Sequence, residues 1–187
     1  MALDPLNPRS LVVLARELAR AGMPDSAIAV YRHAQRLDPM HPILLGTGPS
    51  LPSGPAEVFL WQRRYDEAVE EYVRVATLRG SPAGETAAMR DAYAKAGMRG
   101  FWQRWLEMEL RGPSRPDPLR LASVWALIGD TSRAVEWLDR AYEERNPGLI
   151  FMRHEPTFEG LVSHSRVARI LKAMRFPGQD AGPQRRP

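Results

Sequence analysis

The chain has 187 residues, a length that fits one ordinary domain or a short array of repeats. Its 26 Lys and Arg residues against 22 Asp and Glu residues give a net charge of only +4, which does not call for a nucleic acid partner. The absence of cysteine excludes disulfides, thiolate metal sites and cysteine nucleophiles. The start, MALDPLNPRS, lacks the apolar core of a secretory signal, and no apolar run approaches the roughly 18 residues of a membrane span. We therefore expect a cytoplasmic protein without a membrane partner.

Residues 8–41 have the pattern of two amphipathic helices joined at residues 21–24, with Pro39 ending the pair. The first helix places Leu11, Leu14 and Leu18 on one face, and the second places Ala27, Tyr31, Ala34 and Leu37 on one face. The small Ala27 lets the two helices approach closely. The order along the second helix, from Ala27 through the aromatic Tyr31 to Ala34 and Pro39, resembles a tetratricopeptide (TPR) repeat. That resemblance implies an all-α fold in which helix pairs of about 34 residues stack into a right-handed superhelix.

Two markers repeat further along the chain. The small residue of the second helix recurs as Ala27, Ala68 and Ala134, and the glycine between the helices recurs as Gly22, Gly97 and Gly129. All spacings follow from a unit of about 34 residues with an insertion of about seven before the second repeat and a deletion of about two before the fourth. The insertion falls in residues 45–55, a Gly-, Pro- and Ser-rich stretch that we expect to be a loop.

The sequence therefore predicts a single TPR domain over residues 1–176, built from about four helix pairs. The repeats span about 8–41, 56–80, 83–112 and 116–146, residues 147–176 form a helical cap, and residues 177–187 form a disordered tail. In the third repeat Trp102 stands where the small residue is expected, so that pair should be splayed. In the cap a final helix is expected at about 163–174, with Val167, Ile170, Leu171 and Met174 on one stripe.

The C-terminal part shows a narrower resemblance. Residues 124–174, with AYEER at 141–145, then Pro156, Phe158 and Leu161, are similar to the end of bacterial TPR regions that follow winged-helix transcriptional regulators, serine/threonine kinases and nucleotide cyclases. In those proteins the TPR region is the interaction or regulatory arm, and another domain performs catalysis or DNA binding. The resemblance implies either a free-standing relative or a detached arm of such a regulator.

Motifs for catalysis or cofactor binding are incomplete. His154-Glu155 begins like a zinc-protease helix, but Phe158 stands where the second ligand is needed and Pro156 interrupts the helix. The glycines of residues 46–54 are not followed by the Lys and Ser or Thr of a phosphate-binding loop. We therefore expect no enzyme activity, no metal and no cofactor.

The expected function is binding of a partner peptide or helix in the concave groove that the first helices of TPR repeats line. Matching the groove positions of the repeat to this sequence gives Arg9, Val12, Arg16, Arg20, Trp61, Asp91, Lys95 and Arg120 as candidate partner-binding residues. Arg16 and Arg20 make the groove basic, which would suit an acidic or mixed peptide. The alternative, that these arginines only solvate a helix face, stays open. Trp61 and Trp105 are expected to be partly exposed, as aromatic anchors of binding surfaces are. The alternative function is that of a regulatory arm in a bacterial signalling or transcription regulator whose effector domain is separate.

Overall fold

The computed structural model describes residues 7–46, 51, 54–112 and 115–174, and every regular element within these ranges is a helix. The expected all-α class is therefore confirmed for this part of the chain. The residues divide into two compact units, one ending at Arg115 and one beginning at Pro116, and each is described by itself. The single domain over residues 1–176 stays a prediction. The predicted tail at 177–187 and most of the predicted loop at 45–55 lie outside the described residues.

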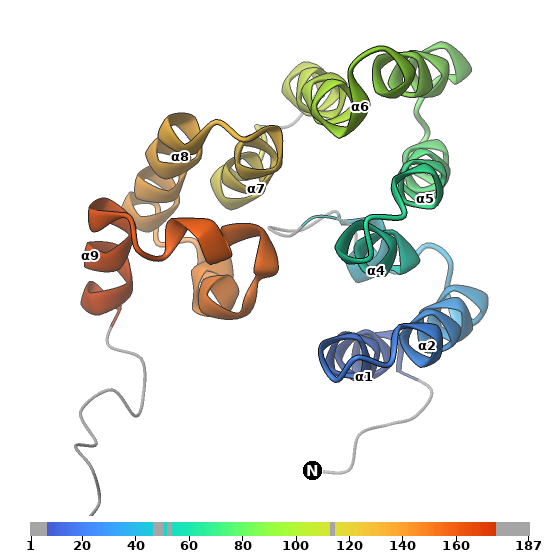
Figure 1. Ribbon diagram of the computed structural model, residues 1–187, viewed down its shortest axis with the longest axis horizontal. Coiled ribbons are helices and arrows are strands. Elements are labelled where there is room, and N and C mark those ends of the chain that lie inside the picture. The colour runs from blue at the N-terminus through green and yellow to red at the C-terminus, as the bar shows by residue number, and fades with distance from the viewer. Residues whose placement is uncertain (1–6, 47–50, 52–53, 113–114, 175–187) are drawn as a thin grey trace, which may run out of the picture. The chain divides into compact units, whose positions relative to one another are not determined.

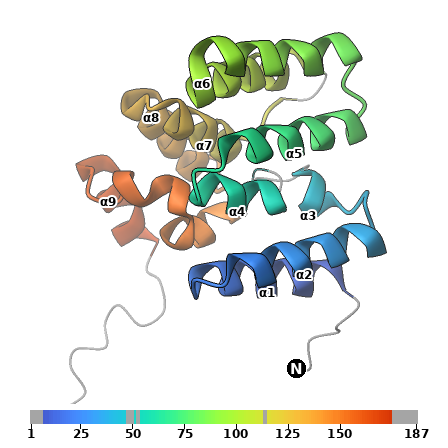
Figure 2. The same cartoon turned by 45° about the vertical axis from the view of Figure 1, so that its right-hand side comes forward.

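The first unit consists of three helix pairs. They are α1 (Pro8–Arg20) with α2 (Pro24–Leu37), α4 (Pro55–Trp61) with α5 (Tyr65–Leu78), and the two halves of α6 (Ala83–Arg111), with the short α3 (Pro42–Leu45) between the first two pairs in sequence. Figures 1 and 2 show the pairs in successive layers, in which α4 packs against α2 and α5 packs against α6. The short α3 lies outside the four predicted repeat ranges, and α4 begins one residue before the second of them.

Small and aromatic side chains fill the space between α1 and α2. Ala15, Ala27, Tyr31 and Ala34 are fully buried there. The sequence pattern places Leu14 on the inward face, but this side chain is 46% exposed. It lies about 100° around α1 from Ala15, and Ala15 faces the core that α1 shares with α2, so Leu14 remains outside. The inward arc of α1 is therefore rotated from the predicted one.

The long α6 is two helices joined at a break. Ala96 and Gly97 have non-helical backbone angles, and Gly97 has φ of 61°, in the region that favours glycine. The break falls at the glycine that the repeat spacing marks as an inter-helix turn. After the break the halves come so close that a Cβ on Gly100 would lie 2.4 Å from the carbonyl oxygen of Ala92. Only glycine fits there without a shift of the backbone.

The bulky Trp102 is accommodated in an aromatic cluster. Its ring centroid lies 4.9 Å from that of Tyr72 on α5, 5.1 Å from that of Phe101 and 5.9 Å from that of Trp105, in edge-on arrangements that aromatic rings favour. All four side chains are buried. The expectation that Trp105 is partly exposed is therefore wrong, because Trp105 fills the core between α5 and α6.

The second unit packs one helix pair against a helical C-terminal segment. Its elements are α7 (Pro118–Ile128), α8 (Thr131–Glu143), the 3₁₀ segments η1 (Pro147–His154) and η2 (Pro156–Leu161), and α9 (Ser165–Ala173). Val167, Ile170 and Leu171 are buried against α7 and α8 residues, as the predicted stripe requires, and Met174 packs at the margin of this core. Asp117 ties the ends together, because it caps α7 by accepting from the backbone N–H of Leu119 at 2.8 Å and also accepts from the Asn146 side chain at 2.8 Å.

The same turn joins the helices of three pairs. Gly22, Arg63 and Gly129 each have a left-handed backbone, with φ of 75°, 59° and 87°. In each case the next residue donates its N–H to the carbonyl five residues earlier, which is the Schellman arrangement. These bonds join Met23 to Leu18 at 2.9 Å, Arg64 to Phe59 at 2.8 Å and Asp130 to Trp125 at 3.0 Å. Arg63 thus occupies the backbone position that glycine fills in the other two turns.

A buried residue follows each turn at a fixed distance. The residue five positions after the left-handed one is Ala27, Ala68 or Ala134, and all three are fully buried in the helix pair. In α6 the corresponding residue after Gly97 is Trp102, which is also buried. This combination of turn and burial recurs inside the helix pairs, whereas the left-handed turns at Gly80 and Arg145, which lie between elements, have no buried residue five positions later.

Candidate functional site

The eight residues predicted to bind a partner have different environments. Arg9, Arg20, Asp91 and Lys95 are exposed, Arg16 and Trp61 are half-buried, and Val12 and Arg120 are buried. Val12 retains 1% of its accessible surface because it packs between α1 and α2, and Arg120 of the second unit retains 8%. Neither of these two side chains is accessible to a partner in this conformation.

The helices α1 and α4 bring most of the first-unit candidates together. In Figure 2 the turn from α1 to α2 and the turn from α4 to α5 lie at the same end of the helices, so α1 and α4 run in the same direction. An ion pair between Arg16 of α1 and Glu57 of α4 joins them side by side. Arg20 lies one turn beyond Arg16, and Trp61 lies one turn beyond Glu57. Arg20 and Trp61 therefore lie on the same side of the ion pair, toward the C-terminal ends of α1 and α4.

Glu57 is the centre of a buried polar cluster. Arg16 donates from Nη2 to Oε1 of Glu57 at 2.8 Å and from Nε to Oε2 at 3.3 Å, while the Tyr31 hydroxyl donates to Oε2 at 2.7 Å. Glu57 is 7% exposed and Tyr31 is fully buried. Burial, reinforced by the negative charge of Glu57, raises the pKa of Tyr31 far above its usual range, so the hydroxyl keeps its proton and acts as a donor. The cluster binds α1, α2 and α4 to one another.

The pairing changes the electrostatic character of the predicted groove. Arg16 faces Glu57, and Arg20 donates from Nη1 to Oε1 of Glu17 at 2.5 Å. Two of the three candidate arginines on α1 therefore have a carboxylate beside them. We call the α1–α4 surface the exposed side chains Arg9, Val13, Glu17 and Arg20 of α1 together with the half-buried Trp61 of α4; Val13 is 51% exposed. This surface is mixed in charge rather than strongly basic.

The candidates Asp91 and Lys95 lie on the first half of α6, which is held against α5 by polar contacts. Arg90 donates to both carboxylate oxygens of Glu70, at 2.8 Å and 2.7 Å, and the Tyr93 hydroxyl donates to Asp66 at 2.6 Å. The hydrogen bonds from Arg90 lower the pKa of Glu70, and the bond to Asp66 raises the pKa of Tyr93 to about 12. Asp91 and Lys95 belong to a helix whose position these contacts fix.

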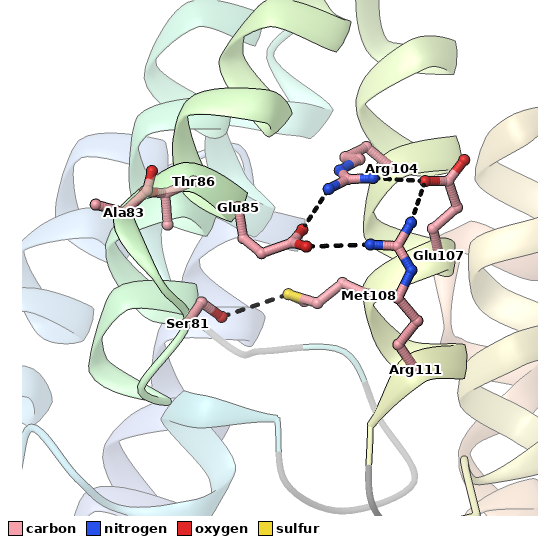
Figure 3. A network of polar contacts seen from close by, with 8 residues as sticks. All are labelled: Ser81, Ala83, Glu85, Thr86, Arg104, Glu107, Met108 and Arg111. Carbon is pink, nitrogen blue, oxygen red and sulfur yellow. Dashed lines mark hydrogen bonds and ion pairs between the residues drawn. The ribbon is translucent and has the colours of Figure 1, made fainter.

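A second polar network joins the two halves of α6. Figure 3 shows Glu85 of the first half between Arg104 and Arg111 of the second half, with Glu107 on the far side of both arginines. Glu85 lies 2.7 Å from Arg104 and 3.1 Å from Arg111, and Glu107 lies 2.7 Å and 3.1 Å from the same two side chains. These contacts hold the two halves of α6 against each other. Because two arginine charges balance two glutamate charges, the network has no excess charge to offer a ligand.

Sequence reasoning missed that buried glutamates connect successive helix pairs. The three ion pairs are Arg16–Glu57, Arg32–Glu71 and Arg79–Glu109, and each joins an arginine of one pair to a buried glutamate of the next. One signal was available, because Arg16 and Glu57 are 41 residues apart, the spacing between Ala27 and Ala68. Residues in the same phase of adjacent repeats lie side by side, so opposite charges there indicate a pair.

Among the residues that the structure describes, no three or more Asp, Glu or His side chains gather in a way that could hold a metal ion. None of the described helices combines the length and the apolar character of a membrane span. Comparison of the chain with protein-family models, with curated proteins and with solved structures found no match.

Proposed function

We propose that the chain is a TPR-like helical-repeat protein without enzyme activity, which binds a peptide segment or helix of a partner protein. The observation that carries this proposal is the recurrent turn, in which a left-handed residue is followed five positions later by a buried alanine. A helix pair of this kind cannot bury both of its faces alone, so it stacks on neighbours and presents a continuous series of first helices. Such a series offers an extended surface to a partner segment.

The α1–α4 surface is the binding site in this proposal. It combines the exposed apolar Val13 with the half-buried ring of Trp61, beside side chains of both charges. Tryptophan is enriched among residues that dominate binding energy, because a large ring is desolvated at low entropic cost. The ion pair between the half-buried Arg16 and the buried Glu57 supports this surface by fixing the spacing of α1 and α4.

The charge pairing defines the kind of segment that fits. Since Arg16 and Arg20 each have a glutamate beside them, a purely acidic segment would have to compete with Glu57 and Glu17. A segment with an apolar anchor between polar residues of both signs meets less competition. We therefore propose a mixed amphipathic segment as the ligand, rather than an acidic one.

The experiment is a selection of peptides from a random display library on the immobilised full chain, followed by affinity measurements with variants. We expect Trp61→Ala to weaken the selected peptide about 30-fold, the size of a typical tryptophan anchor, and Val13→Asp to weaken it as well. Ala29→Asp, on an exposed position of α2, is the matched control and should leave the affinity unchanged. Equal affinity for Trp61→Ala and Ala29→Asp would reject the α1–α4 surface as the site.

A further inference from the structure

The positive charge of the chain is concentrated at its C-terminal end. Residues 164–187 contain six Lys and Arg residues and a single carboxylate, Asp180, so their excess of +5 is larger than the net charge of +4 of the whole chain. The preceding part of the second unit, residues 116–163, has the opposite balance, with eight Asp and Glu residues against five Arg residues. A basic segment therefore follows directly on an acidic one.

In the structure this basic segment begins with α9. The apolar side of α9 is buried in the core of the second unit through Val167, Ile170 and Leu171. The opposite side exposes Arg166, Arg169 and Lys172, at intervals of three residues, and the helix contains no acidic residue. Side chains three residues apart lie on the same face of a helix. We call this exposed row of three cations the α9 basic face.

Only part of this charge is compensated within the described residues. Arg166 forms an ion pair with Asp139 of α8. Within the same described ranges, neither Arg169 nor Lys172 forms an ion pair, and both side chains are exposed. Beyond α9 the sequence continues with Arg175. The α9 basic face therefore presents two cations to solvent on a helix that its own core holds in place.

We propose that the α9 basic face binds an acidic segment of a partner protein through Arg169 and Lys172. The two charges are separated by about 4.5 Å along the helix axis. A segment with carboxylates three or four residues apart on a helix places its charges at a similar spacing. The arginine fork can accept a carboxylate in two parallel hydrogen bonds, whereas lysine acts as a point charge.

Two other anionic partners fit this surface less well. A membrane-bound amphipathic helix inserts its apolar side into lipid, but the apolar side of α9 is already buried against α7 and α8. Single-stranded nucleic acid stacks its bases on aromatic side chains, and α9 contains none. A long polyanion would also meet the acidic excess of residues 116–163. A short acidic protein segment needs neither an apolar side for insertion nor aromatic rings for stacking. It is also short enough to contact the α9 basic face alone.

The test measures binding of labelled probes to the full chain by fluorescence anisotropy. The probe is a helical peptide of Glu-Ala-Ala repeats, and Gln-Ala-Ala repeats serve as its uncharged counterpart. The variant Arg169→Gln/Lys172→Gln removes the two cations, and Arg36→Gln/Arg99→Gln removes two exposed arginines from α2 and α6 as a matched control. All four side chains are exposed, so thermal melting should be unchanged in both variants.

We expect the Glu peptide to bind more tightly than the Gln peptide, and added salt to weaken it. The Arg169→Gln/Lys172→Gln variant should bind it about tenfold more weakly, as expected for the loss of two exposed charge pairs. The control variant should bind it within about twofold of the wild type. Equal losses in the two variants would overturn the proposal. The proposal would also be overturned if a DNA or RNA oligonucleotide, or phosphatidylserine vesicles, bound more tightly than the Glu peptide and this binding required Arg169 and Lys172.

Discussion

Removal of the Glu57 carboxylate should destabilise the first unit strongly. In Glu57→Ala the hydroxyl of Tyr31, which is fully buried, loses its acceptor, and an unsatisfied buried group costs about 1–3 kcal/mol. The Arg16 side chain loses its partner too, but it is 21% exposed and water can reach it. The loss of the ion pair should therefore cost less free energy of unfolding than the roughly 3–5 kcal/mol that breaking a fully buried ion pair costs. Together these effects predict a loss of about 3 kcal/mol in the free energy of unfolding.

Urea unfolding followed by far-UV circular dichroism measures this loss. Glu57→Gln keeps one acceptor oxygen for Tyr31, so it should lose only about half as much as Glu57→Ala. A double variant, Arg16→Met/Glu57→Met, removes both charges and should be less destabilised than the sum of its single variants by about 1–2 kcal/mol. Additive effects of the two single substitutions, or a loss of under about 1 kcal/mol in Glu57→Ala, would refute the buried cluster.

Three further predictions concern the turns, the packing and the pH dependence. In urea unfolding, Gly129→Ala should lower the free energy of unfolding by about 1 kcal/mol, because a Cβ strains the left-handed turn. Arg63→Gly should raise it by about 0.5 kcal/mol by relieving the same strain. A lower free energy of unfolding in Arg63→Gly would contradict the shared turn. Ala134→Trp should lower the melting temperature strongly through overpacking between α7 and α8, and an unchanged melting curve would remove this residue from the helix interface. Because the pKa of Tyr31 is raised in the folded state, only the unfolded state loses this proton just above about pH 10, so stability should fall there as pH rises. In Tyr31→Phe that part of the alkaline loss should be absent from denaturation curves measured at a series of pH values; an identical pH dependence would contradict the buried hydroxyl.

The turns of the fold could be predicted because their determinants are local. A left-handed residue at the end of a helix favours glycine, so Gly22, Gly97 and Gly129 mark three turns in the sequence. A small residue is needed where two helices cross closely, which is why Ala27 and Ala134 carry the same phase. The turn at Arg63 carries no such mark, because an arginine gives no local sign of a left-handed backbone.

The environment of the candidate site was harder to predict because it depends on contacts between distant residues. The local sequence around Arg16 is the same whether this side chain faces a ligand or Glu57, and only the position that α4 takes beside it decides. Similarly, periodicity places Leu14 on an apolar stripe, but the direction from which neighbours contact α1 leaves it exposed. Trp105 is buried because the bulky Trp102 beside it draws α5 and α6 into one aromatic cluster.

The central claim is that the α1–α4 surface binds a partner segment, and the indole N–H signal of Trp61 tests it most directly. The chain contains five tryptophans, so its NMR spectrum should show five indole signals, which single Trp→Phe variants assign. On addition of a selected peptide the Trp61 signal should shift or broaden, because this side chain is half-buried at the surface, whereas the signals of the buried Trp102 and Trp105 should stay in place. A bound peptide that leaves the Trp61 signal unchanged while it shifts tryptophans elsewhere would contradict the account.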